Sequence, residues 1–165
     1  MIRLLFDIIL ILFCFCMQQT FFQALSLGGI VPNLLLIITA IFGFVSGKRE
    51  GMWVGFFCGL LLDIFYADIM GINALLYMSI GYYNGYYKGG FFLEDIKMPI
   101  LYVLLSEIIY SSVYFVINFA LRGRSNIFLY AKAIIIPELF YTLLVTLLLY
   151  RPLLFLIKKT NFDGE

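Results

Sequence analysis

The chain has 165 residues, of which 64% are hydrophobic and 13% are charged. Soluble domains have about 45–50% apolar and about 25% charged residues, so this composition excludes an ordinary soluble globule and indicates an integral membrane protein. The 11 basic and 10 acidic residues give a net charge of +1, which excludes the basic surface of a nucleic-acid-binding protein. The sequence has no histidine, which excludes histidine-based nucleophile pairs, zinc sites and proton relays.

Six apolar segments follow one another along the chain. They cover residues 4–22, 30–46, 51–66, 70–83, 99–121 and 129–150, and glycine-rich or polar stretches separate them. A helix that crosses a bilayer needs about 20 mostly apolar residues, so the shorter segments imply tilt or a locally thin bilayer. We therefore expect one all-α transmembrane domain over residues 1–165, with six helices in the lipid bilayer.

The basic residues of the loops predict the orientation, because short loops rich in Lys and Arg stay on the cytoplasmic side. With both termini in the cytoplasm, the inner set is Arg3, Lys48, Arg49, Lys88, Lys97, Arg151, Lys158 and Lys159. The outer set is then only Arg122, Arg124 and Lys132. This asymmetry predicts that both termini are cytoplasmic, although the loop with Arg122 and Arg124 runs against the trend.

The third segment carries a column of glycines that ends in an acid. Gly47, Gly51, Gly55, Gly59 and Asp63 are each four residues apart, and Gly81 and Gly85 repeat this spacing in the fourth segment. Residues at that spacing lie on one face of a helix, and small residues there let another helix approach until the backbones nearly touch. The column therefore predicts close helix packing, either with another span of the same chain or at an interface with a partner.

Four acids fall inside apolar segments: Asp7, Asp63, Glu107 and Glu138. An ionisable group in hydrocarbon costs about 3 kcal/mol or more, so each needs a partner or a polar cavity. No Lys or Arg occupies the central part of a span, so we expect the two glutamates to hydrogen-bond as neutral acids. A polar stripe at helical spacing starts from the first of them: Glu107, Ser111, Tyr114 and Asn118.

The sixth segment has Pro137 directly before Glu138, which predicts a kink where the carbonyl of Ala133 loses its donor. The two glutamates and the stripe have three readings that stay open: hydrogen bonds inside the protein, a ligand or lipid-headgroup cavity, and proton coupling.

Catalysis has little support in the sequence. Intramembrane hydrolysis by two aspartates needs them at one depth, but Asp7 and Asp63 are predicted at opposite faces of the membrane. The sequence has no phosphate-binding loop, no metal-ligand cluster and no nucleophile motif. We therefore expect no enzymatic activity, no cofactor and no metal.

The block from residue 32 to residue 85 resembles the rod shape-determining protein MreD family. The resemblance rests on Pro32-Asn33-Leu34, Glu50-Gly51, Gly55, Gly59 to Asp63, Gly71, Ala74-Leu75, Tyr77, Gly81 and Gly85. One departure is Asn33, where the family more often has an acid. The resemblance implies a non-catalytic subunit of the cell-wall elongation machinery in the bacterial inner membrane, with MreC, MreB and the peptidoglycan synthases as partners.

The same family is similar in fold to the substrate-binding subunits of energy-coupling-factor vitamin transporters, which sets the rival hypothesis. In that reading Glu107, Asn118, Glu138 and Asp63 line a cavity for a vitamin-like molecule or a lipid-linked precursor. The first helix lacks the small-residue spacing with which such subunits dock to their energising partner, which favours the scaffold. Self-association stays open in both readings.

Overall fold

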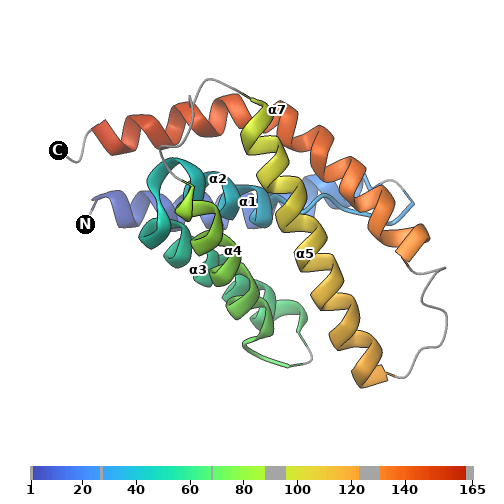
Figure 1. Cartoon of the computed structure of the whole chain (residues 1–165). Coiled ribbons are helices and arrows are strands. Elements are labelled where there is room, and N and C mark those ends of the chain that lie inside the picture. The colour runs from blue at the N-terminus through green and yellow to red at the C-terminus, as the bar shows by residue number, and fades with distance from the viewer. Residues whose placement is uncertain (1, 27, 68, 88–95, 123–130, 163–165) are drawn as a thin grey trace.

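The computed structural model of the chain describes residues 2–26, 28–67, 69–87, 96–122 and 131–162. These residues form six α-helices and one π-helical turn, so the predicted all-α class is confirmed (Figure 1). The elements are α1 (Ile2–Ala24), α2 (Leu34–Ser46), α3 (Lys48–Tyr66), α4 (Ile72–Tyr86), α5 (Lys97–Arg122), η1 (Ala131–Ile135) and α7 (Ile136–Phe162). Two of the loop cations that predict the orientation, Lys88 and Arg124, lie outside the described residues.

Helix α2 lies at the centre of the molecule. Its first twelve residues, from Leu34 to Val45, are all buried, and α1, α3, α4, α5 and α7 all contact it. A helix that is apolar around its whole circumference is buried on all sides. With 13 residues it is about 20 Å long, which is shorter than the roughly 30 Å hydrocarbon core of a bilayer. The segment that we expected to cross the membrane therefore forms the core of the fold.

Three helices have the length and composition needed to cross a membrane, within the described residues. These stretches are Leu5–Ala24 in α1, Lys97–Ile117 in α5 and Lys132–Lys158, which covers most of η1 and of α7. Only 17% to 22% of the apolar window in each stretch is buried inside the protein, as expected for helices in contact with lipid. Three of the six expected spans thus meet these criteria.

Helices α3 and α4 form an antiparallel hairpin with the most extensive helix contact in the molecule. The hairpin packs on α2, and Figure 1 shows its two helices side by side, α3 in teal and α4 in green. Its turn contains Gly71 with a φ of 102°, a left-handed conformation that glycine adopts without steric cost.

The described part of the last segment begins with a π-helical turn, and its helix runs past the expected end at residue 150. A π-helical turn precedes Pro137, and its wider hydrogen-bond register is one way in which a helix accommodates a proline that cannot donate. At the other end the helix continues past Tyr150, through Pro152, to Phe162.

Candidate functional site

The glycine columns of α3 and α4 face each other inside the hairpin. A Cβ atom added at Gly51 would meet the carbonyl oxygen of Gly81 at 2.5 Å, and one added at Gly59 would lie 2.5 Å from the Cα atom of Ala74. A Cβ atom at Gly85 would lie 2.5 Å from the carbonyl carbon of Gly47. The glycines thus let two backbones of the same chain touch, and this face is occupied by the chain itself.

Asp63 accepts three hydrogen bonds from the start of the next helix. Its Oδ2 accepts from the backbone N–H groups of Gly71 at 3.0 Å and Ala74 at 2.8 Å, and its Oδ1 accepts from Asn73 at 3.1 Å. The first N–H groups of a helix have no partner within it, and a negative charge there is stabilised by the helix dipole. Asp63 is only 2% exposed, so a buried carboxylate closes the hairpin beside its turn.

Asn33 ties α2 to two other helices. Its Oδ1 caps α2 by accepting from the N–H of Leu36 at 3.3 Å, and it also accepts from the hydroxyl of Tyr77 at 2.7 Å. Its backbone N–H donates to Oγ1 of Thr142 on α7 at 3.2 Å. The amide thus joins α2, α4 and α7 at the residue where the sequence departs from the more frequent acid.

A second set of polar contacts brings α5 into this network. The hydroxyl of Tyr110 donates to Oδ1 of Asn73 at 3.2 Å, and its ring packs edge-on against Tyr77 with centroids 5.3 Å apart. Further along, Nδ2 of Asn84 donates to Oγ of Ser106 at 2.8 Å. Buried polar groups therefore connect α4 to α5 at two levels.

Glu107 is the exception in this network. Its side chain is fully buried, and neither carboxyl oxygen has a hydrogen-bond partner within the described residues. Glu138 on α7 is near enough to interact electrostatically with it, as are Tyr77 and Tyr110. The structure therefore brings the two glutamates into one region, although it does not pair Glu107 with a hydrogen-bond donor.

The rest of the predicted stripe divides between interior and surface. Ser111 is buried, whereas Tyr114 is 36% exposed and stacks on Tyr110 with centroids 5.6 Å apart. The side chain of Asn118 lies outside the described part of the structure. Asp63, which the rival hypothesis placed at a ligand cavity, accepts hydrogen bonds from the start of α4 at the turn of the hairpin.

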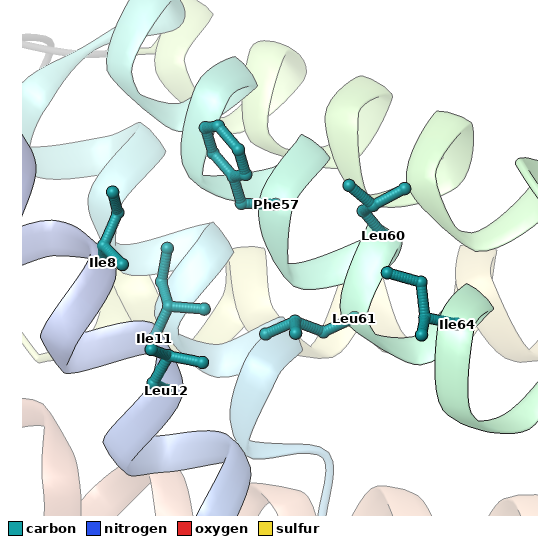
Figure 2. Close-up of a pocket in the computed structure, with 7 residues that line it drawn as sticks. All are labelled: Ile8, Ile11, Leu12, Phe57, Leu60, Leu61 and Ile64. Atoms are coloured by element: carbon teal, nitrogen blue, oxygen red, sulfur yellow. The ribbon is translucent and has the colours of Figure 1, made fainter.

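A groove runs between α1 and α3, which we call the α1–α3 groove. One part encloses about 170 Å³ between apolar side chains of both helices, which Figure 2 shows facing one another. These are Ile8, Ile11, Leu12, Phe57, Leu60, Leu61 and Ile64. A neighbouring hollow of about 330 Å³ shares Ile8, Ile11 and Phe57 with it and ends at Asp7, Arg49 and Glu50.

Sequence reasoning missed several members of the polar network. Thr39 and Thr142 are buried within apolar runs, and only their hydroxyl groups distinguish them from their neighbours. Asn33 did carry a signal, because an Asn directly before an apolar helix is a favoured N-cap. No group of three or more Cys, Asp or Glu side chains could hold a metal ion in the part of the chain that the structure describes.

The comparisons with known proteins are consistent with this arrangement. A family model described as rod shape-determining protein MreD matches residues 1–160, nearly the whole chain. No curated protein and no solved structure matches, so the expected likeness to vitamin-transporter subunits stays a prediction.

Proposed function

This chain belongs to the rod shape-determining protein MreD family, and from that premise we propose that it is a non-catalytic subunit of the bacterial cell-wall elongation complex. In this role it links MreC, MreB and the peptidoglycan synthases within the inner membrane. Both termini lie in the cytoplasm, as the distribution of Lys and Arg favours. The family itself establishes a membrane protein that determines rod shape.

The observation that carries this proposal is the hairpin closed by Asp63. Its carboxylate oxygens bind three backbone N–H groups of the next helix, so this intramembrane acid is used to hold two helices together. Asn33, Tyr77 and Tyr110 likewise join helices to one another. Buried polar groups that satisfy one another make a fold rigid and specific, which is what a scaffold for other membrane proteins requires.

The experiment is a co-purification from a rod-shaped bacterium that depends on this chain for its shape. The tagged chain is extracted gently from native membranes, and the proteins and small molecules that accompany it are identified by mass spectrometry. We expect MreC and wall synthases without a stoichiometric small molecule. An ATPase pair or a bound vitamin, with no wall synthase, would contradict the scaffold role.

Two variants test whether the co-purification depends on the hairpin. Asp63→Ala removes the acceptor of three buried N–H groups, so we expect lower accumulation in the membrane and loss of the partners. Ser79→Ala changes an exposed polar residue on α4 and should leave both unchanged. If both variants recover the partners equally well, complex assembly does not depend on the hairpin closed by Asp63.

A second candidate function is a membrane subunit that binds a vitamin-like molecule or a lipid-linked precursor. One observation favours it, namely that Glu107 is fully buried and has no hydrogen-bond partner within the described residues. A buried carboxyl group without a partner is costly, and a polar ligand would supply one. The same mass spectrometry tests this candidate, which requires a stoichiometric small molecule that Glu107→Gln releases.

A further inference from the structure

The outer side of the α3–α4 hairpin carries large apolar and aromatic side chains, and we call it the hairpin face. On α3 it includes Trp53 and Phe65, and on α4 it includes Leu75 and Tyr83, all of them exposed. The other described helices therefore leave this face open to its surroundings. In a membrane protein the surroundings of such a face are lipid, so the height of the hairpin face states which bilayer fits it.

One end of the hairpin face carries cations and aromatic rings. Lys48 and Arg49 begin α3 and are exposed. The Nζ atom of Lys48 lies 4.1 Å from the ring centroid of Tyr86 and 5.9 Å from that of Tyr82, which are cation–π distances. Tyrosine rings and basic groups favour the headgroup level of a bilayer, so this end of the hairpin lies at one membrane surface.

The other end of the hairpin face is the turn that joins α3 to α4. Tyr66, Ile69 and Met70 are exposed there, and Ala67 and Gly71 lie outside both helices. Irregular backbone that faces lipid does not occur within the hydrocarbon of a bilayer, because its N–H and C=O groups would lack partners. The turn must therefore reach the headgroups of the opposite membrane surface.

The distance between these two ends is shorter than an ordinary bilayer requires. From Gly51 to Tyr66 helix α3 rises ~22 Å, and from Ile72 to Tyr86 helix α4 rises ~21 Å. The hydrocarbon core of a typical bilayer is about 30 Å thick. Tilt only lowers the height that a helix spans, so neither helix can make up the difference of ~8 Å by tilting.

The long helices do not have this mismatch. In Figure 1 helix α5 runs in a different direction from α1 and α7, so these three helices cannot all stand upright in a membrane. A helix that is longer than the hydrocarbon is thick adapts to the bilayer by tilting. The apolar stretch Lys132–Lys158 is ~39 Å long, so α7 fits an ordinary bilayer in this way. The mismatch is therefore specific to the hairpin.

We propose that the hairpin face binds a locally thinned bilayer, with ~22 Å of hydrocarbon between the two headgroup layers. The partner of this surface is the lipid itself, in the form of short or disordered acyl chains next to α3 and α4. Lipids beside α7, which packs on α2 and α5, keep the ordinary thickness. The protein thus thins the membrane on one side only.

The first test measures depth with tryptophan fluorescence, because the single tryptophan of the chain, Trp53, lies in the hairpin face. The full chain is reconstituted in phosphatidylcholine vesicles whose acyl chains have ordinary length and carry bromine, a quencher, either near the headgroup or near the chain end. Trp53 should be quenched most by bromine near the headgroup. In a Trp53→Phe background, Tyr66→Trp should also report headgroup depth, whereas the control Leu144→Trp, near the middle of the α7 stretch, should be quenched most by bromine at the chain ends.

Positions 53 and 66 are ~20 Å apart along α3, so headgroup depth at both is possible only in a thinned bilayer. If Tyr66→Trp is instead quenched like Leu144→Trp, the turn ends inside the bilayer and the proposal is overturned. Weak quenching at both hairpin positions by every brominated lipid would show that a second copy of the chain covers this face, which is also against the proposal.

The second test asks which lipid the hairpin face prefers. Vesicles contain a brominated phosphatidylcholine of ordinary length and an unbrominated competitor with shorter or longer acyl chains, and relief of quenching reports the lipid beside the tryptophan. At Trp53 the shorter competitor should displace the brominated lipid at least about twofold better than the longer one. Leu144→Trp in the Trp53→Phe background should show no such preference, because α7 adapts by tilting. Equal displacement by both competitors at Trp53, or the same preference at both positions, would overturn the proposal.

Discussion

Replacement of Gly55 by alanine or leucine tests the close packing of the hairpin. A Cβ atom at this position would lie 2.7 Å from the carbonyl carbon of Tyr77 and nearer still to its carbonyl oxygen, whereas ordinary contact begins at 3.4 Å, so α3 and α4 must separate by at least 0.7 Å. When two atoms in contact move apart by that distance, they lose about a quarter to a half of their dispersion attraction. Overpacking of this kind costs about 1–3 kcal/mol, against which alanine gains about 1 kcal/mol of helix propensity over glycine.

We therefore expect Gly55→Ala to be destabilised by up to about 2 kcal/mol, the difference of those two terms, and Gly55→Leu by more. The assay is thermal unfolding of the purified protein in detergent, together with its level in the membrane. Ser79→Leu is the control, because it adds the same bulk at an exposed position of α4. If Gly55→Leu unfolds at the same Tm as the parent chain, the glycines do not set the distance between the helices.

Three further substitutions test the polar network. Asp63→Asn keeps one carbonyl oxygen as an acceptor, so its Tm should lie between those of Asp63→Ala and the parent chain; a Tm equal to that of Asp63→Ala would mean that the charge is indispensable. Tyr77→Phe should cost about 1 kcal/mol in thermal unfolding through its lost hydrogen bond to Asn33, and an unchanged Tm would argue against that bond. Glu107→Gln should accumulate and support rod shape almost normally in a microscopy assay of cell shape, whereas full loss of shape with normal accumulation would favour a ligand or proton carrier.

The sequence predicted most of the helices, but it did not predict which helix forms the core of the fold. Apolar periodicity and glycine-rich breaks predicted an all-α chain, and the described helices occupy the predicted segments with shifted ends. The second segment was expected to cross the membrane like the others. A run such as Leu34 to Val45 is equally apolar whether lipid or other helices surround it, so hydropathy alone does not distinguish the two environments.

The glycine spacing identified a packing face but not the helix that packs against it. Residues four apart define a stripe on one helix, and the stripe on α4 that meets it is known only from the fold. For Asp63 the sequence predicted that a partner is needed, because a carboxylate in an apolar segment is costly. That its partners are backbone N–H groups eight to eleven residues later follows from the tight turn, which no single side chain of the sequence encodes.

Glu107 lacks the hydrogen-bond partner that a buried carboxyl group in an apolar segment is expected to have, within the described residues. Every other buried acid or amide discussed above has a hydrogen-bond partner in the structure, so the fold clearly supplies donors where it needs them. The nearby hydroxyls of Tyr77 and Tyr110 donate to Asn33 and Asn73 instead, which leaves no proton on either for the carboxyl group. Glutamine has nearly the same shape, so selection for packing alone would tolerate it. Glu107→Gln therefore separates a purely structural residue from one whose carboxyl group needs a partner other than the described residues.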